Sequence, residues 1–452
     1  MLPTITPQAS AAMPTPVRLP GWFRWPYPMP IGRIGRKYAA YIDPRSYINP
    51  AVWAGPSYHV DGVSGVDTNT GLGAYDGDFS AAKKSIFSAI TAGNATGAPY
   101  RVIVKAGTYT QERSINGSSG QAGVEPTQHC AFIAWGGIVY HVAGTAEAAW
   151  VNDGSGTNTY TGGPSNASRV FDRLNLDIHG SYTELVNVAD QSTVRATAGS
   201  WSGLGTKLAI RRADGLTPDS ENTLVLRNID TAAFDSCTTD LYFEGFHFHG
   251  GTFGALWIDP VSTRNVVCVD CEAAYSGTTA NPLDAFRIRR VQGLVLMVRC
   301  TARKAWKDGF NYHDDDAADF SMRVMHIDCR GYSTGKTGSS SNNNLTTHDF
   351  VILLDLNGDY RDGSIGADVH VIEGTQTVLL GTTISAGVNG GVQLACIRAT
   401  NNAVLYGENI NLTSPGATIV AEGAASRVIL RGATYSGAAP SSVSGGSIVT
   451  IT

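Results

Sequence analysis

The chain has 452 residues, a formal net charge of −5, only 16 % charged residues and 52 glycines. This length exceeds one ordinary compact core and indicates either several domains or a repeat array. The weak acidic balance gives no reason to expect a nucleic-acid partner, and no run of 18 apolar residues predicts a membrane span. Many glycines and few charges favour an all-β chain with tight turns.

Residues 1–56 differ in composition from the rest of the chain. The first 50 residues hold 10 of the 19 prolines and six lysines or arginines against one aspartate. Proline fixes φ and lacks an N–H, which disfavours a helix or a central strand. Aromatic residues are common interface anchors, and four stand among these prolines: Trp22, Phe23, Trp25 and Tyr27. We expect a basic, extended arm that docks onto another protein, with a disordered tail as the alternative.

Residues 57–452 are predicted to form the body, and residues 57–115 its first part. The stretch from Phe79 to Ala92 has a helical period, with Ala82, Ile86, Ala89 and Ile90 on one face. A buried strand is expected from Arg101 to Lys105. A helix followed by a strand can cover the open end of a stacked β-array. Further on, at about residues 145–222, small and polar residues predict either an inserted subdomain or a set of irregular coils.

Residues 236–440 carry a repeat of short apolar runs that are each followed by turn residues. Cys271, Cys300 and Cys329 occupy one column, 29 residues apart. Self-similarity at this period indicates a solenoid or a related array. A propeller blade needs four strands in about 40–45 residues, which these repeats cannot hold. A parallel β-solenoid is therefore expected, with an insertion between the runs that begin at Arg323 and Thr377.

A second column supplies one more strand per repeat. Because alternate residues of a strand share a face, one set is expected to point inward: Leu256, Phe286, Phe310, Phe350, Val392 and Thr418. Their neighbours are expected to point outward: Trp257, Arg287, Asn311, Val351, Gln393 and Ile419.

The column of Cys271, Cys300 and Cys329 is expected to be a ladder of buried thiols. Residues stacked one coil apart have nearly parallel Cβ vectors, which disfavours a disulfide; a metal or redox site is the alternative. An unpaired set of thiols fits folding in a reducing cytoplasm. The first 20 residues have no early positive charge and no apolar core, so no secretory signal is expected.

Polar residues concentrate on the middle coils, where the sequence predicts a functional site. Asp284, Asp308 and His348 are expected to form a column at the turn that enters the second strand of each repeat. Asp259, Arg289, His313 and Leu353 are expected to form an outward column beside it. The remaining candidates would bind substrate through charge, hydrogen bonds or flat rings: Trp257, Arg287, Trp306, Lys307 and Asn311.

Two stacked carboxylates suit glycoside hydrolysis, because one can serve as a general acid whose pKa its neighbour raises. His313 with Arg287 and Arg289 would instead suit elimination from a uronate. Against both stands a structural interpretation, since an aspartate before a turn often caps backbone N–H groups.

No cofactor is expected, although two groups offer oxygen ligands for calcium: Asp61 with Asp67 and Asn69, and Asp314 with Asp315 and Asp316. His247 and His249 share a face but show no third metal ligand in the sequence.

The stretch from Tyr58 to Tyr109 resembles the N-terminal cap and first coil of pectate-lyase-like right-handed parallel β-helix proteins. The resemblance lies in two clusters of residues: Tyr58, Val60, Asp61, Gly65, Asp67, Asn69 and Gly71, then Val102, Val104, Lys105, Gly107, Thr108 and Tyr109. With the repeats it covers about residues 57–440. No catalytic motif of a lyase family matches residue for residue.

The superfamily includes polysaccharide lyases, glycoside hydrolases, epimerases and bacteriophage tailspikes. With the arm and no secretory signal, the chain resembles a tailspike or tail-fibre depolymerase. That resemblance implies a homotrimer, made in the host cytoplasm and carried on the virion tail, whose residues 1–56 contact virion proteins. The body would bind and cleave a bacterial surface polysaccharide, by hydrolysis rather than elimination. The alternatives are a non-enzymatic receptor-binding or structural virion protein, and a bacterial polysaccharide lyase or epimerase.

Overall fold

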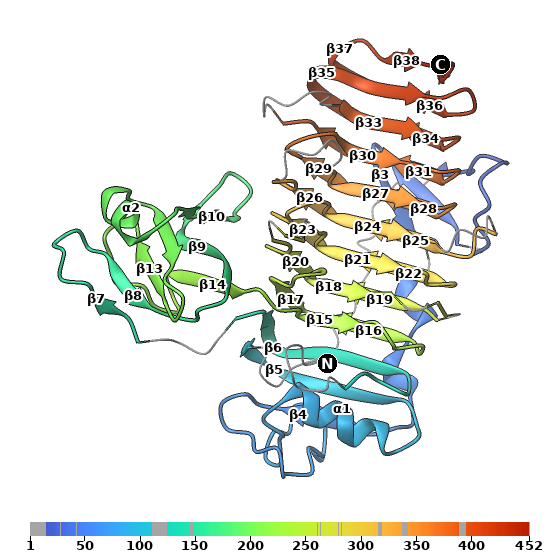
Figure 1. Cartoon of the computed structure of the whole chain (residues 1–452). Coiled ribbons are helices and arrows are strands. Elements are labelled where there is room, and N and C mark those ends of the chain that lie inside the picture. The colour runs from blue at the N-terminus through green and yellow to red at the C-terminus, as the bar shows by residue number, and fades with distance from the viewer. Residues whose placement is uncertain are drawn as a thin grey trace.

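The chain folds as a right-handed parallel β-helix, as its sequence predicted (Figure 1). The computed structural model describes residues 15–451 apart from 28, 42, 111–123, 145–148, 260, 263, 279, 282, 315–318, 337–341 and 388–394. One 28-stranded sheet coils so that most strands pair with the strand three positions further along the chain. Within the described residues, no helix is long and apolar enough to cross a membrane.

Three strand columns form the faces of the β-helix. Sheet A comprises β15 (Ala232–Phe234), β18 (Leu256–Ile258), β21 (Phe286–Arg289), β24 (Phe310–His313), β27 (Leu345–His348), β30 (Ala367–Val371), β33 (Ala395–Thr400), the second half of β35 (Asn411–Glu422) and β38 (Ser441–Val443).

Sheet B comprises β4 (Ser57–Val60), the first halves of β5 (Tyr100–Thr110) and β6 (Cys130–Val142), β16 (Leu241–Glu244), β19 (Val266–Val269), β22 (Leu294–Val298), β25 (Arg323–Ile327), β28 (Ile352–Leu356), β31 (Gln376–Leu380), β34 (Val404–Glu408), β36 (Arg427–Arg431) and β39 (Ser447–Ile451).

Sheet C comprises the second halves of β5 and β6, β17 (Phe246–His249), β20 (Glu272–Ala274), β23 (Thr301–Arg303), β26 (Arg330–Tyr332), β29 (Asp359–Arg361), β32 (Thr383–Ser385), the first half of β35 and β37 (Thr434–Ala438).

One residue per coil turns the chain from sheet B into sheet C with a left-handed backbone. The residues with positive φ at this turn are Gly245, Asp270, Arg299, Asp328, Asn357, Gly381, Asn409 and Gly432. From Asp270 to Asn357 they recur every 29 residues, which is the predicted period. Glycine, asparagine and aspartate tolerate this conformation best, so the turn composition follows from the backbone that the coil requires.

The insertion predicted between Arg323 and Thr377 is wrong, because a further coil occupies this stretch. β28 pairs with β25 on one side and with β31 on the other. The cysteine column is interrupted in this coil. Arg330 pairs with Asp359, so the residue in register with Cys329 is Gly358.

Inward-facing residues fill the β-helix with one continuous core. The predicted stack of Leu256, Phe286 and Phe310 is confirmed, and the two phenyl rings lie 5.0 Å apart and parallel. The next member is Leu345, not Phe350, which lies in a turn with φ of 65°. Val351 and Ile419 belong to the core, so their predicted outward orientation is wrong.

Val392 and Gln393 lie outside the described residues. Cys271, Cys300 and Cys329 are buried and free, as predicted, and so are the other four cysteines.

The first coil is covered by one short helix. α1 (Ile86–Asn94) begins seven residues later than the helical period predicted, because Ser85 caps it by accepting a hydrogen bond from the Ser88 N–H. Ile86, Ala89 and Ile90 are fully buried against the core, as expected.

The described part of the arm packs on the outer face of sheet B. It contains β1 (Thr15–Pro16), β2 (Ile31–Ile34), β3 (Lys37–Ala40) and the 3-10 turns η1 (Pro44–Tyr47) and η2 (Pro50–Val52). The apolar residues of this face include Leu296, Leu354 and Leu380, and they form one buried cluster with Phe23 and Tyr38. The arm's aromatic residues are therefore covered by the chain itself, which removes the need for a partner to shield them. A virion contact of residues 1–56 stays a prediction.

Residues 149–228 form a lobe that projects from the β-helix between β6 and β15 (Figure 1). A five-stranded sheet and a three-stranded sheet build it, from β7 (Val151–Asn152), β8 (Tyr160–Gly162), β9 (Ala167–Leu176), β10 (Tyr182–Glu184), β11 (Val186–Asn187), α2 (Gln191–Ala196), β12 (Ser200–Gly203), β13 (Leu208–Arg211) and β14 (Thr223–Arg227).

The lobe contacts sheet C through aromatic residues. Phe171 and Tyr182 lie 4.6 Å and 5.3 Å from the ring of Tyr275.

Candidate functional site

Most of the predicted site residues meet on the outer surface of sheet A. The register places two outward columns side by side, which we call the sheet A face: Trp257, Arg287, Asn311, Thr346, His370 and Arg398; then Asp259, Arg289, His313 and His348. Strands of neighbouring coils lie ~4.8 Å apart. The face therefore carries charged and aromatic groups at regular spacing, whereas Asn311 and Thr346 in the first column are almost fully buried.

An aromatic platform lies at the end of this face nearest the cap. The rings of Phe253 and Trp257 stack at 5.0 Å, and the Arg287 guanidinium lies 5.8 Å from the Trp257 ring. Trp257 Nε1 donates to Asp259 Oδ2 at 3.2 Å, and Arg290 pairs with the other oxygen of Asp259 at 2.7 Å. Asp259 is thus held by two neighbours and fixes the orientation of the indole.

Asp284 and Asp308 belong to a ladder of side chains that cap the next coil. Asp284 Oδ1 accepts from the Asp308 N–H at 3.2 Å, and Asp308 Oδ1 accepts from the Asn343 N–H at 2.8 Å. Asn343 Oδ1 accepts in turn from the Ala367 N–H at 3.2 Å. The third member of the column is therefore Asn343, and the prediction of His348 there is wrong.

The two aspartates differ in their electrostatic environment. Burial, followed by the nearby charge of Asp308, raises the pKa of Asp284 to about 7. Asp308 Oδ2 accepts from Asn311 Nδ2 at 2.8 Å and lies 3.7 Å from Lys307 Nζ. The charge of Asp308 raises the pKa of Lys307, despite the opposing effect of its burial. Near neutral pH this group thus holds one carboxyl that is ready to release a proton.

Two imidazoles stack at the end of the face where sheet A turns into sheet B. His313 pairs with His348, with ring centroids 4.0 Å apart, so Leu353 does not follow His313 as predicted. Leu353 instead belongs to β28 of sheet B.

Each stacked imidazole has a carboxylate partner that sequence reasoning missed. His313 Nδ1 lies 3.0 Å from Asp349 Oδ2, and His348 Nδ1 lies 3.4 Å from Glu373 Oε2. Burial, followed by positive charges such as Arg289, lowers the pKa of His313 to about 3. Burial, followed by the charge of His313, lowers the pKa of His348 to about 3. Both rings are therefore neutral near pH 7.

Trp306 lies away from the sheet A face. Its ring is 4.8 Å from Lys336 Nζ and 5.5 Å from the Arg169 guanidinium of the lobe. Trp306 follows sheet C in its coil, whereas Lys307 reaches Asp308 and the sheet A face. One of the two tryptophans predicted to bind substrate is thus separated from the other.

The residues considered for calcium are engaged with protein groups. Asp61 Oδ2 lies 2.7 Å from Lys105 Nζ, and its other oxygen accepts from the Val63 and Ser64 N–H groups. Asp67 Oδ1 accepts from the N–H groups of Lys84 and Ser85 and from the Ser85 hydroxyl.

Asn69 donates to the Ala82 carbonyl. Asp314 accepts from Ser321 and Met322, while Asp315 and Asp316 lie outside the described residues.

A cleft of about 580 Å³ separates the lobe from the first coils of the β-helix. Sheet C and the lobe line it together. Its ring-bearing and charged lining residues are Tyr140, Trp150, Arg173, Tyr182, Asp219, Glu221 and His249. No sequence pattern indicated this cleft, because its two walls come from segments with different folds.

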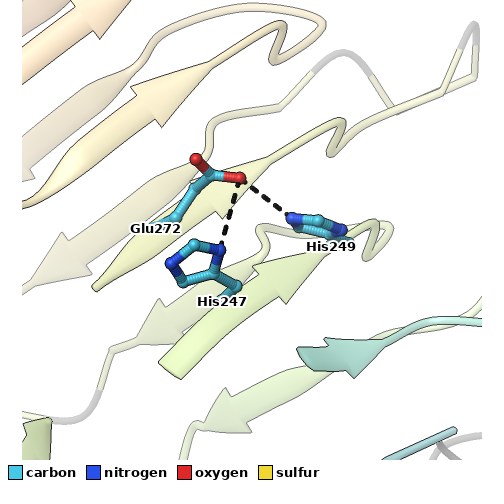
Figure 2. A group of neighbouring side chains, drawn as sticks. All are labelled: His247, His249 and Glu272. Carbon is cyan, nitrogen blue, oxygen red and sulfur yellow. Dashed lines mark hydrogen bonds and ion pairs between the residues drawn. The ribbon is translucent and has the colours of Figure 1, made fainter. Parts of the chain in front are cut away.

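Three potential metal ligands converge on sheet C beside this cleft (Figure 2). Glu272 Oε1 lies 3.0 Å from His249 Nε2 and 3.8 Å from His247 Nδ1. The sequence showed only the two histidines. Glu272 comes from the next coil, where it pairs directly with His247 across the two strands.

The sequence matches no protein-family model, and no curated protein matches it. Solved structures that match this chain include the complex of XylC with xylose, at 10 % identity and a TM-score of 0.45 over 84 % of this chain and 70 % of that one. A glycoside hydrolase aligns at 10 % identity and a TM-score of 0.40 over 88 % of this chain and 96 % of its own. Likeness at this level assigns no function to the chain.

Proposed function

We propose that the chain binds a bacterial surface polysaccharide along the sheet A face and cleaves it by hydrolysis. The observation that carries this proposal is the continuity of the face. The register aligns Trp257, Arg287 and Asn311 on three successive coils, with the carboxyl groups of Asp284 and Asp308 beside them. A polymer can follow such a row of coils, since each coil adds ~4.8 Å of surface.

The proposed chemistry assigns the proton donor to Asp284. A general acid works best when its pKa lies near the working pH, and the pKa of Asp284 is raised to about 7. Asp308 would supply the second carboxylate, on the neighbouring coil, where the spacing of strands suits a retaining pair. Trp257 would stack on a sugar ring, while Arg287 and Lys307 would bind acidic or hydroxyl groups.

Binding without cleavage is the second candidate function, and a specific observation favours it. Asp308 is fully buried, and both of its oxygens accept hydrogen bonds from asparagine groups of the protein. A carboxylate engaged in this way stabilises a turn and has little freedom to attack a sugar. The sheet A face would then recognise the glycan without breaking it.

Elimination is the remaining alternative. His313 is neutral near pH 7 and could accept a proton, with Arg289 beside it to face a uronate. Its Nδ1, however, lies 3.0 Å from Asp349, which leaves only Nε2 for this role.

The first test is incubation of the purified chain with a panel of capsular and O-antigen polysaccharides, with chain length and ultraviolet absorbance followed together. Hydrolysis shortens the polymer without new absorbance, whereas elimination creates a conjugated C=C bond that absorbs. We expect shortening without absorbance for wild type and a loss of at least about 100-fold for Asp284→Asn. Asp359→Asn, on the outer surface of sheet C, serves as the control. Unchanged cleavage by Asp284→Asn would contradict the assignment of Asp284 as the general acid.

We further propose, from the resemblance to tailspikes, that the chain is a homotrimer on a bacteriophage tail. Light scattering of the purified chain at micromolar concentration would give three times the chain mass of 47.7 kDa. A monomer at all concentrations would count against a tailspike.

A further inference from the structure

We propose that His247, His249 and Glu272 bind a divalent transition-metal ion, with Zn²⁺ as the best fit, beside the cleft between the lobe and sheet C. This site is separate from the sheet A face and does not depend on the proposed function. It rests on the convergence of three donor atoms and on its place at a cleft.

The donor atoms are already assembled. One ring nitrogen of each histidine and one carboxylate oxygen lie within 4.8 Å of one another. Ligand atoms of a tetrahedral zinc site, at 2.0–2.2 Å from the ion, are roughly 3.3 Å apart. The separations of 3.0 Å and 3.8 Å from Glu272 Oε1 bracket that value, so small side-chain rotations would complete the site.

The fold explains why these residues meet. His247 and His249 are two positions apart on β17, so both point outward from sheet C. Glu272 is the direct neighbour of His247 on the next coil. Three ligands on two adjacent strands of a rigid sheet need no loop to order them, which lowers the entropic cost of binding.

Neighbouring side chains hold the ligands in place. Glu272 Oε2 lies 2.9 Å from Arg303 Nε, which leaves Oε1 for an ion. The ring of Tyr140 lies edge-on to both imidazoles, at 5.3 Å and 5.6 Å. Outer partners of this kind orient metal ligands in proteins.

The composition of the group sets the class of ion. Two imidazoles and one carboxylate suit Zn²⁺ with three protein ligands, and also Fe²⁺, whereas Ca²⁺ and Mg²⁺ prefer oxygen. A three-ligand site keeps its fourth position for water or a ligand. His249 lines the cleft, so that position would be accessible to a molecule in it.

A purely structural role is the competing explanation. His249, Glu272 and Arg303 form a hydrogen-bonded and ionic chain across three coils, which could serve only to tie these coils together. His247 separates the two explanations. Its side chain is 20 % exposed and its nearest approach to Glu272 is 3.8 Å, so it contributes little to that chain.

The test is calorimetric titration of the metal-stripped full-length chain with Zn²⁺, followed by Co²⁺ absorption spectroscopy. We expect one ion per chain and intense visible bands typical of a four-coordinate cobalt site. His247→Ala and Glu272→Gln should each weaken Zn²⁺ binding by at least about 100-fold, because each removes a ligand. His129→Ala, a half-exposed histidine paired with Asp240, is the matched control and should bind as wild type does.

A chain that binds no Zn²⁺ would overturn the proposal, as would binding that His247→Ala leaves unchanged. Loss of binding in His348→Ala alone would place the ion at the stacked imidazoles of the sheet A face instead. His247→Ala is expected to fold, and far-ultraviolet circular dichroism checks that it does. A folded His247→Ala variant tests the proposal even if Glu272→Gln misfolds.

Discussion

At the scale of single residues, the same carboxylates are candidates for chemistry and for structure. Asp284 and Asp308 each cap the backbone of the following coil, which is the role that aspartates before turns often have. The pKa of Asp284 is raised into the neutral range. The two functions of the pair can be separated by measuring stability and cleavage on the same variants.

The stability of the chain should depend on the protonation of Asp284. Its pKa in the folded chain, about 7, is above its ordinary value of 3.8. The folded state therefore binds this proton more tightly, and the associated stability is present below pH ~4 and lost as pH rises through 7. We expect the free energy of unfolding of wild type, relative to Asp284→Asn, to fall between pH 4 and pH 8. Urea titrations at several pH values measure it, and a constant difference would contradict the burial of an ionisable carboxyl.

Asp308 should tolerate an amide but not truncation. Asp308→Ala leaves the buried Asn343 N–H without its acceptor and should cost about 1–3 kcal/mol. Asp308→Asn can still accept that hydrogen bond, and its new N–H can donate to Asn311 Oδ1 once the Asn311 amide, whose Nδ2 donates to Asp308 Oδ2 in wild type, rotates by half a turn. Near wild-type stability with lost cleavage would identify a catalytic Asp308. Equal destabilisation by Asp308→Ala and Asp308→Asn would contradict the claim that Asp308 stabilises the chain by accepting the Asn343 N–H.

Sequence reasoning found most of the residues of this face but misplaced the last of them. The stack of Leu256, Phe286 and Phe310 was predictable, because apolar residues recur at a registered spacing. His348 was shifted because the following residues, Asp349 and Phe350, adopt left-handed backbones that end the strand there. Such turns are not visible in a pattern of apolar residues.

At the scale of elements, the turns decide where each coil begins. The 29-residue repeat and the cysteine column revealed most coils of the β-helix. The coil that contains β28 was missed because glycine replaces cysteine at position 358. The left-handed residue of that turn is retained as Asn357. The backbone requirement is thus a more reliable marker of a coil than the packed side chain.

Relaxing one left-handed turn should stabilise the chain. Ser333 has φ of 52° at the turn that leaves β26. Ser333→Gly removes the steric cost of this conformation and should raise the free energy of unfolding by up to about 1 kcal/mol, whereas Ser333→Val should lower it by about 1–2 kcal/mol. Ser385, in strand β32, is the control, and Ser385→Gly should destabilise by about 0.5–1 kcal/mol. Destabilisation by Ser333→Gly would contradict this explanation.

At the scale of the whole molecule, two additions cover the β-helix, and the sequence indicated their presence but not their contacts. The arm was recognisable from its prolines. The docking of the arm on sheet B could not be predicted from the sequence, because the outward residues of that sheet, such as Leu296 and Leu354, are apolar like core residues. Tyr38 fixes the arm by pairing its backbone N–H and C=O with the Asn357 side chain.

Deletion of residues 1–56 should expose a large apolar surface. Without the arm, the outer face of sheet B loses its cover, and a patch of this kind promotes association. We expect the shortened chain to bind a hydrophobic dye strongly and to aggregate at concentrations where wild type stays dispersed. Tyr38→Ala should give a weaker version of the same change. If the shortened chain behaves as wild type does, the arm serves only to contact another protein.

The measurement that tests the sheet A face most directly is the affinity of one bound polysaccharide for two tryptophan variants. Trp257 lies on the face beside Arg287, whereas Trp306 contacts Arg169 of the lobe. The two residues are chemically identical and differ in position. We predict that Trp257→Ala weakens binding by roughly 5–150-fold, the loss expected when one ring contact worth about 1–3 kcal/mol is removed, and that Trp306→Ala leaves it unchanged. Weakened binding by Trp306→Ala, with full affinity for Trp257→Ala, would place the glycan against the lobe and contradict the account.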